Sequence, residues 1–526
     1  MRWLLRCVAP PTRIQPDGRI LVGGATHRNN HLTFAVLRLH PDGSRDTAWA
    51  TTYYEFHPGE LSYRSDEVRL VLVQPDGRVL AVGDEVAARY RADGTLDETF
   101  GTGGAVRFQH GADGVVAGFF DPEGRLWSVG SDNTGVHSRR IVLTVNRIPD
   151  PGRFHALAPA RILDTRVGNG APVAKLGPHT SLLLQVTGRG GVPVAGVSAV
   201  VLNLTITEPT EGTFLTAWPG DSPRPLASNL NVSAGQTLPN LVTVAVGADG
   251  SVAIYNQHGS AHLIADVAGW YGDGPEVAGA RYHALTPDRL LDTRDGAGVA
   301  VGPNGPLDLQ VTGRAGVPAS GVSAVVMNLT AVSPTAGTFV TAWPAGQARP
   351  LASNLNLVAG QTAPNLVVVA VGAGGKVSLY NFAGAVHLVA DVAGWYGDGT
   401  EAGGDRFHSF SPGRILDTRY GNGAPAAPIG PLAPLELQVT GRGGVPAVDV
   451  AAVILNVTVT EPTANTHLTV WPSGGARPLA SNLNFAPGQT VANLVTVGVG
   501  AGGKVSIHVA GGLSHVVVDV AGWYGG

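Results

Sequence analysis

A block of about 125 residues occurs three times in the chain, and this repetition constrains the fold more than any other feature. Each copy has Leu-Asp-Thr-Arg near its start, at 163–166, 291–294 and 416–419. Each copy ends in Asp-Val-Ala-Gly-Trp-Tyr-Gly, which begins at Asp266, Asp391 and Asp519. A unit of this length is the size of one compact domain. The repeats therefore predict three similar domains, joined by short glycine-rich segments, at 151–274, 279–399 and 404–526.

Hydrophobic and polar residues alternate within each unit, which is the pattern of β-strands with one buried face. The clearest examples are Leu-Asp-Leu-Gln-Val-Thr at 307–312 and Leu-Glu-Leu-Gln-Val-Thr at 435–440. Glycine-rich turns separate such segments, as at 247–250, and no stretch has a sustained helical period. Each unit is therefore predicted to be an antiparallel β-sandwich or a small β-barrel, and the whole chain is predicted to be all-β.

Residues 1–150 contain a different and shorter repeat. Gln-Pro-Asp-Gly-Arg occurs at 15–19 and 74–78, each time before aliphatic residues, and a degenerate copy spans 120–130. Pro-Asp-Gly is a turn signal, because proline presets φ, aspartate braces the backbone and glycine takes a positive φ. Short strands that repeat at the spacing between 15–19 and 74–78 are typical of propeller blades. Since a closed propeller needs about four blades or more, residues 1–150 are predicted to form a partial β-propeller region.

The composition excludes several classes of protein. Of the 526 residues, 44% are hydrophobic and 14% are charged, and the net charge is −4. Such a chain can bury cores, and it has no basic surface for nucleic acid. Cys7 is the only cysteine, which excludes an intrachain disulfide framework and a cysteine zinc site. No window is long and apolar enough for a membrane span, and the first residues lack the apolar core of a signal peptide.

The N-terminal motifs resemble the delta-60 repeat, in which Gln-Pro-Asp-Gly-Arg is followed by Leu-Asp-Glu-Thr-Phe-Gly, here at 96–101. The resemblance covers most of residues 10–145 and implies propeller-like β-structure. Only two good copies and one poor copy are present, fewer than a closed propeller needs. We therefore expect that the N-terminus is truncated and that further blades precede it.

The three long units resemble a tandem domain of exported and cell-surface proteins from high-GC Gram-positive bacteria. The motifs that carry this resemblance, over about 370 residues, are Leu-Asp-Thr-Arg, Gly-Val-Pro, Ser-Asn-Leu-Asn and Ala-Gly-Trp-Tyr-Gly. The resemblance implies an extracellular or cell-surface location, often beside a catalytic module. It carries over no established biochemical activity, and no cofactor is predicted.

Charged residues recur at the start and the end of every unit. They are Asp164, Arg166, Asp266, Asp292, Arg294, Asp391, Asp417, Arg419 and Asp519. Because charges among apolar strands are usually paired, we interpret them as a structural brace between the first and last strands. The alternative is a charged binding or catalytic spot. A histidine precedes each closing aspartate by four residues, about 13 Å along a strand and too far for one metal ion, so no metal site is predicted.

Side-chain amides and an indole form the most suggestive candidate site. Each unit has a tryptophan, then Arg-Pro-Leu-Ala-Ser-Asn-Leu-Asn, then Gly-Gln-Thr and Asn-Leu-Val. The candidate ligand-binding residues are Trp218, Arg224, Asn229, Asn231, Gln236, Asn240, Trp343, Arg349, Asn354, Asn356, Gln361, Asn365, Trp471, Arg477, Asn482, Asn484, Gln489 and Asn493. Such groups can stack on the apolar face of a sugar and hydrogen-bond its hydroxyls. The alternative is that the tryptophan belongs to the core and that the amides hold loops.

No nucleophile elbow, metalloprotease helix or phosphate-binding loop is present, and no catalytic residue or cofactor is predicted. We therefore hypothesise a non-catalytic extracellular or cell-surface protein that binds cell-wall or capsular polysaccharide, with avidity from three units. Two alternatives remain open. One is a glycoside hydrolase or lyase that works at a propeller face, and the other is a purely structural spacer.

Overall fold

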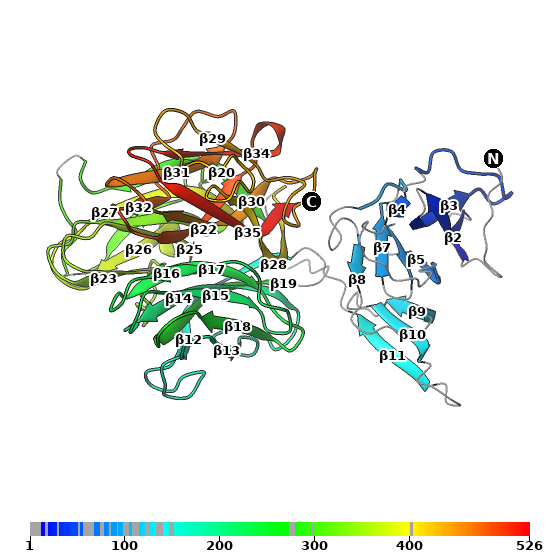
Figure 1. Ribbon diagram of the computed structural model, residues 1–526, viewed down its shortest axis with the longest axis horizontal. Helices are drawn as coiled ribbons and strands as arrows, with labels where there is room; N and C mark the ends of the chain where they lie inside the picture. The colour runs from blue at the N-terminus through cyan, green and yellow to red at the C-terminus, as the bar shows by residue number, and fades with distance from the viewer. Residues whose placement is uncertain are drawn as a thin grey trace. The chain divides into compact units, whose positions relative to one another are not determined.

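The computed structural model consists of two compact units, Met1–Asp150 and Pro151–Gly526, and each is described by itself (Figure 1). The structure describes residues 12–15, 19–28, 31–50, 53–55, 68–73, 78–83, 86–91, 93–97, 105–107, 115–120, 126–132, 140–146, 152–272, 279–295, 298–303, 305–399 and 403–526. Several features of the sequence lie outside these residues: Cys7, the turns at 16–18 and 75–77, the motif ends at 98–101 and 121–125, and the joint at 273–275.

The first unit contains three small antiparallel sheets among its described residues. Their strands are β1 (Thr12–Ile14), β2 (Ile20–Arg28), β3 (His31–Leu39) and β4 (Tyr53–Glu55); β5 (Leu70–Val73), β6 (Val79–Val82), β7 (Val86–Tyr90) and β8 (Ala105–Arg107); and β9 (Val115–Phe120), β10 (Leu126–Asp132) and β11 (Arg140–Asn146). The first two sheets carry equivalent ion pairs, Arg38–Asp46 and Arg89–Asp97, each with 2.8 Å between Nε and Oδ2. The shorter sequence repeat thus corresponds to a repeated sheet.

The second unit contains three β-sandwiches, each made of two four-stranded antiparallel sheets (Figure 1). The strand orders of the first sandwich are β12-β19-β14-β17 and β13-β18-β15-β16. Its strands are β12 (Phe154–Asp164), β13 (Thr180–Gln185), β14 (Val197–Thr207), β15 (Thr213–Pro219), β16 (Leu230–Val232), β17 (Leu238–Ala245), β18 (Ser251–Asn256) and β19 (His262–Gly272). We call the first of these sheets inner and the second outer.

The second and third sandwiches repeat this arrangement, with inner sheets β20-β27-β22-β25 and β28-β35-β30-β33. The second consists of β20 (Tyr282–Asp292), β21 (Leu307–Gln310), β22 (Val322–Val332), β23 (Thr338–Pro344), β24 (Leu355–Leu357), β25 (Ala363–Ala370), a 3₁₀ turn (Ala373–Gly375), β26 (Lys376–Asn381) and β27 (His387–Gly397). The third consists of β28 (Arg406–Asp417), β29 (Leu435–Gln438), β30 (Ala452–Thr460), β31 (Thr466–Pro472), β32 (Leu483–Phe485), β33 (Val491–Gly498), a 3₁₀ turn (Ala501–Gly503), β34 (Lys504–Val509) and β35 (His515–Gly525). The all-β fold is confirmed, and of the two architectures predicted for each unit the sandwich is confirmed.

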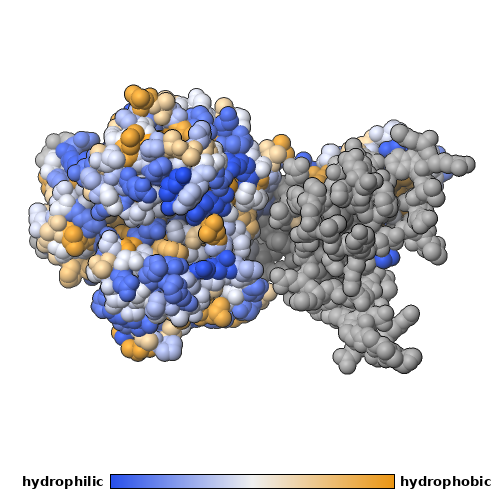
Figure 2. Space-filling view, in the orientation of Figure 1, coloured by the Kyte–Doolittle hydropathy of each residue, from blue (hydrophilic) through white to orange (hydrophobic). Residues whose placement is uncertain are grey.

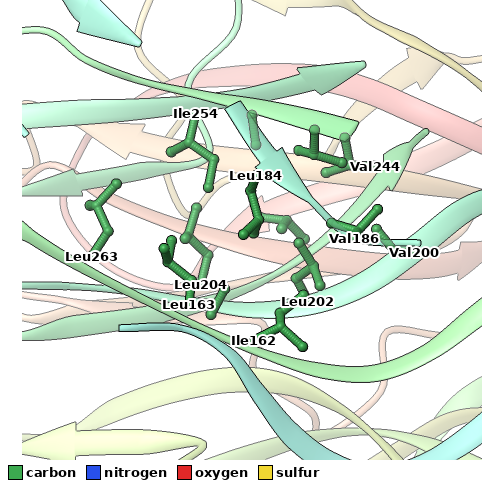
Figure 3. Close-up of a cluster of buried hydrophobic side chains, with 14 of the residues drawn as sticks. Ile162, Leu163, Leu184, Val186, Val200, Leu202, Leu204, Val244, Ile254 and Leu263 are labelled. Atoms are coloured by element: carbon green, nitrogen blue, oxygen red, sulfur yellow. The ribbon is translucent and has the colours of Figure 1, made fainter. Parts of the chain in front are cut away.

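Aliphatic side chains fill the space between the two sheets of each sandwich, as Figure 3 shows for the first. On β18, Val252 and Ile254 point into this core, whereas Ala253 and Tyr255 lie on the opposite face. This is the alternation that a strand with one core-facing side requires. The outer sheets therefore follow the sequence pattern closely.

The inner sheets are buried on both faces, because the three sandwiches share a second core. Val201 on β14 faces away from its own sandwich and packs in a cluster with Phe154, Tyr282 and Phe407, the first aromatic residue of each sandwich. At the centre, the hydroxyl of Tyr271 lies 2.5 Å from that of Tyr396 and 2.7 Å from that of Tyr524. The Tyr396 and Tyr524 hydroxyls are 2.7 Å apart. One tyrosine from each closing motif thus forms a closed triangle of hydrogen bonds.

Amide side chains join each sandwich to the next in the same cyclic way. Asn203 donates to the Ser353 carbonyl at 2.7 Å, and Asn365 donates to the Asn203 side-chain oxygen at 2.9 Å. The equivalent amide pairs are Asn328–Asn493 and Asn456–Asn240. Because the third sandwich bonds to the first, residues 152–526 form a closed ring of three sandwiches with approximate threefold symmetry.

Short backbone bridges close the same ring. Phe154 pairs with Ala280, Tyr282 with Asp405, and Phe407 with Gly152. In each case the first strand of one sandwich pairs with a residue one or two positions before the first strand of the next, and the last bridge returns from the third sandwich to the first.

Candidate functional site

The predicted site residues fall into two groups, one at the contacts between sandwiches and one on the outer sheets. Asn240, Asn365 and Asn493 belong to the first group and are buried. Each amide nitrogen donates two hydrogen bonds. One goes to the side-chain oxygen of an asparagine in a neighbouring sandwich, and the other goes to a backbone carbonyl of the same sandwich. Each also accepts a backbone N–H from another sandwich. These amides are fully engaged within the protein.

Asn229 and its equivalents hold the loop that precedes the short fourth strand of each outer sheet. The three side-chain oxygens accept the backbone N–H groups of Ala217, Ala342 and Val470 at 2.7–2.8 Å. The three acceptors are Asn229, Asn354 and Asn482, and all three residues are buried. These three amides therefore brace the loop in their own sandwich.

The remaining amides lie closer to solvent. Asn231 and Asn356 donate to Ser228 and Ser353, three residues earlier, and Asn484 is half-buried at the equivalent position. Gln236, Gln361 and Gln489 accept the backbone N–H three residues before them and so close a turn. Asn231, Asn356 and Asn484 lie on β16, β24 and β32, the short outer strands that contact the inner sheet of a neighbouring sandwich.

The recurring charged residues form one ion-pair network in each sandwich. In the second, Arg294 donates to both oxygens of Asp292, at 2.8 and 2.6 Å. Arg289 donates to Asp391 at 2.8 Å from Nε and 3.3 Å from Nη2, to Asp292 at 3.0 Å, and to the Leu479 carbonyl of the third sandwich at 3.0 Å. Equivalent pairs in the other sandwiches are Arg166–Asp164, Arg161–Asp266, Arg419–Asp417 and Arg414–Asp519. The arginine that reaches the closing strand is therefore the first residue of the Arg-x-Leu-Asp-Thr-Arg motif, which the sequence interpretation did not single out.

The two aspartates of this network have opposite pKa shifts. Hydrogen bonds from the Arg294 side chain are the main reason that the pKa of Asp292 falls to about 2. Burial raises the pKa of Asp391, although the Arg289 side chain opposes this effect. The same opposition occurs at Asp164 and Asp266 and at Asp417 and Asp519.

Acid should remove the stabilising contribution of Asp292. A carboxyl whose pKa falls from 3.8 to about 2 on folding stabilises the folded state above pH 4. Because Arg294 is 48% exposed, solvent screening limits this contribution to about 1 kcal/mol, and it is lost as the pH falls from 4 to 2. We expect the free energies of unfolding of the wild type and of Asp292→Asn to differ at pH 7 and to converge towards pH 2. Chemical denaturation across this range measures both. A difference that stays constant from pH 7 to pH 2 would contradict the assignment.

The outer sheets carry the second group of predicted residues. Trp218 lies on the face of β15 turned away from the sandwich core, with Tyr255 and Phe214 beside it. Its indole N–H donates to the Ser222 carbonyl at 2.8 Å, and the residue is 5% exposed. Trp343 and Trp471 make the equivalent bonds at 3.0 and 3.1 Å. The tryptophan rings are therefore packed under the loop that follows each strand.

An exposed arginine on that loop lies over an aromatic ring of the neighbouring strand. The guanidinium carbon of Arg224 is 3.7 Å from the centre of the Tyr255 ring, and that of Arg349 is 3.9 Å from the centre of the Tyr380 ring. Among the described residues, neither Arg224 nor Arg349 donates a hydrogen bond or forms an ion pair. Their N–H groups are therefore available to a ligand.

Phenylalanine side chains extend these surfaces. Phe214 lies 6.5 Å from Tyr255, and Phe339 lies 6.4 Å from Tyr380, between ring centres. In the second sandwich Phe382 stacks on Phe339 at 4.6 Å and is 52% exposed. We call each set of tryptophan, arginine, tyrosine and phenylalanine an Arg–aromatic face. Figure 2 shows hydrophobic residues as small groups among hydrophilic ones on the visible side of the second unit.

The third sandwich differs from the other two at this surface. His508 occupies the position of the tyrosine, and Arg477 donates from Nη1 to its ring, 2.8 Å from Nδ1. His467 occupies the position of the phenylalanine, and burial lowers its pKa. The sequence interpretation named the three arginines and tryptophans but missed Tyr255, Tyr380 and His508. The sequence signal available for these three residues was their position in an alternating strand pattern after a Gly-rich turn.

Other candidate sites are weak in the part of the chain that the structure describes. Two shallow recesses of about 490 and 420 Å³ occur at equivalent loops of the second and third sandwiches, near Val301 and Ile429, with mainly apolar linings. Among the described residues, no three histidine, cysteine, aspartate or glutamate side chains lie close enough together to hold a metal ion. No described helix is long and apolar enough to cross a membrane.

Comparison with known proteins identifies only the N-terminal sheets. Two solved structures with some similarity to the chain are a GH32 beta-fructofuranosidase from Bombyx mori and a triple jelly roll fold of an archaeal virus turret assembly. The first has 8% identity over 52% of this chain and 82% of that chain with a TM-score of 0.16, and the second has 9% identity over 76% and 90% with a TM-score of 0.15. No curated protein matches the chain. Residues 15–48 and 74–100 match the model described as a domain of unknown function (DUF5122) beta-propeller, which confirms the propeller-like character predicted for the first unit.

Proposed function

We propose that residues 152–526 are a non-catalytic polysaccharide-binding body with its binding surfaces on the outer sheets. The observation that carries this proposal is the Arg–aromatic face, which combines exposed aromatic surface with a guanidinium that has no hydrogen-bonding partner among the described residues. An aromatic face packs on the apolar side of a sugar ring, and a nearby polar group fixes its orientation. Both elements are present on the second sandwich, whereas on the first the tyrosine is buried and Phe214 is half-buried.

The closed ring supports this assignment because it separates structural residues from available ones. The buried amides and the ion-pair networks hold the three sandwiches together, and the Arg–aromatic faces take no part in the shared core. Several weak sites fixed on one body bind a polymer more tightly than each alone, since the second contact is intramolecular. An extracellular or cell-surface setting, proposed from the resemblance of the repeats to exported bacterial domains, would present such a polymer.

Sedimentation with insoluble polysaccharides and purified bacterial cell walls tests the proposal with the full chain. We expect retention of the wild type on at least one of these materials. The double variant Phe339→Ser/Phe382→Ser should be retained several-fold less, because it removes the exposed Phe382 ring and the Phe339 ring on which it stacks. Val299→Ser is the matched control, since Val299 is 69% exposed in the same sandwich but lies outside the outer sheet.

Each outcome separates two classes of function. Retention that falls in the phenylalanine variant and not in the control supports polysaccharide binding. No retention on any material would overturn it and leave a structural spacer as the explanation of the repeats.

A further inference from the structure

We propose that the Arg–aromatic faces of the first two sandwiches recognise the carboxylate groups of an acidic polysaccharide, through Arg224 and Arg349. This inference rests on the proposed function and names the chemical class of its ligand. The third sandwich contributes less, because its arginine already has a partner.

The two arginines are unusual in being unpaired. Arg289 of the second sandwich donates to two aspartates and a carbonyl, and Arg189 of the first donates to the Asn169 side chain at 2.8 Å. By contrast, Arg224 and Arg349 are exposed, and their only described partner is the ring below them. A guanidinium without a partner retains five N–H donors for an acceptor from outside.

Stacking on tyrosine prepares these donors for a planar anion. A guanidinium that lies against an aromatic ring keeps its N–H groups in its own plane, where they form two parallel hydrogen bonds with a carboxylate. The ring also restricts the side chain before a ligand binds, which lowers the entropy cost of binding. In the second sandwich the exposed ring of Phe382 lies in the same cluster and offers surface for the sugar that bears the carboxylate.

The acidic side chain of the same outer sheet does not form an ion pair with the Arg349 guanidinium. Asp308 on β21 accepts the Ser378 hydroxyl at 2.6 Å and forms no ion pair with Arg349 among the described contacts. In the third sandwich the guanidinium of Arg477 is instead bonded to His508. The chain carries a net charge of −4, so it exerts no general attraction on a polyanion. Recognition of an acidic polymer must therefore be local, at these arginines.

Affinity electrophoresis of the full chain with polygalacturonate tests the inference, and its methyl ester serves as the neutral polymer of the same backbone. We expect the wild type to bind polygalacturonate about tenfold more tightly than the ester, the effect of one to two charge-assisted hydrogen bonds. The double variant Arg224→Met/Arg349→Met should bind both polymers equally. Arg477→Met is the matched control and should retain most of the preference.

The probes distinguish this inference from the proposed function. Equal binding of polygalacturonate and its methyl ester by the wild type would overturn the inference while polysaccharide binding stands. Equal or tighter binding of dextran sulfate, abolished by the same double variant, would overturn a carboxylate-specific site in favour of general anion binding. Absence of binding to these polymers and to all materials of the sedimentation experiment would overturn the proposed function itself.

Discussion

Replacing Arg289 by methionine is expected to lower the free energy of unfolding of residues 152–526 by about 3 kcal/mol. Asp391, the main partner of Arg289, has a side chain that is 2% exposed, so the variant leaves a buried carboxylate without its ion-pair partner. Removal of one partner of a buried ion pair costs about 3–5 kcal/mol, and the lower end applies because Arg289 is itself 26% exposed. The variant also removes the bond to the Leu479 carbonyl, which links the second sandwich to the third.

Chemical denaturation at pH 7 measures this loss, with Arg314→Met as the control. Arg314 is exposed in the same sandwich, and its only described hydrogen bond is a long one, 3.4 Å, to the Gln310 carbonyl. A surface arginine of this kind contributes less than about 0.5 kcal/mol. Equal effects of the two variants would show that the Arg289–Asp391 pair does not stabilise the ring. Methionine is chosen because it keeps the aliphatic stem that packs along the strand.

Replacing Tyr396 by alanine is expected to destabilise the ring by about 3–5 kcal/mol, the cost of deleting a large buried side chain. The Tyr396 ring stacks on Phe154 at 4.1 Å between ring centres and contacts Tyr271, so the cavity opens where all three sandwiches meet. Tyr396→Phe keeps the ring and removes only one hydroxyl of the triangle. Because this hydroxyl takes part in two hydrogen bonds, the expected cost is about 1–2 kcal/mol.

Thermal unfolding of both variants distinguishes packing from hydrogen bonding at this centre. The alanine variant should lower the melting temperature several times more than the phenylalanine variant. Similar shifts would mean that the hydroxyl triangle, and not aromatic packing, dominates the shared core. Burial raises the pKa of the Tyr271 phenol well above its ordinary value, so the triangle stays protonated throughout the neutral range.

The β-sandwich architecture could be predicted from the sequence because it depends on short-range alternation. Segments such as 307–312 read as one-sided strands, and β21 and β26 are strands of that kind. The ring could not be predicted in the same way, because its contacts join residues more than 100 positions apart. Val201, Asn203 and Tyr271 have the pattern of ordinary strand residues, and only the arrangement of three sandwiches shows that they face a neighbour.

The candidate site was predicted in part. The arginines and tryptophans of the Arg–aromatic faces were named from the repeated motif, but the motif also contains buried amides that hold loops and neighbours. Identical residues in all three units are expected wherever the three interfaces are equivalent, so repetition favoured structural residues over binding residues. Tyr255 and His508 differ between units and were missed, because the register of β15 against β18 is not visible in the sequence.

Hydrogen exchange of Tyr396→Phe tests most directly whether the three sandwiches behave as one body. Tyr396 lies on β27 of the second sandwich, and its hydroxyl bonds to tyrosines on β19 and β35 of the first and third. If the ring is a single cooperative structure, amide exchange should accelerate in β19 and β35 as well as in β27. Faster exchange confined to β27 and the strands of its own sandwich would contradict a shared core and show that the three sandwiches are independent.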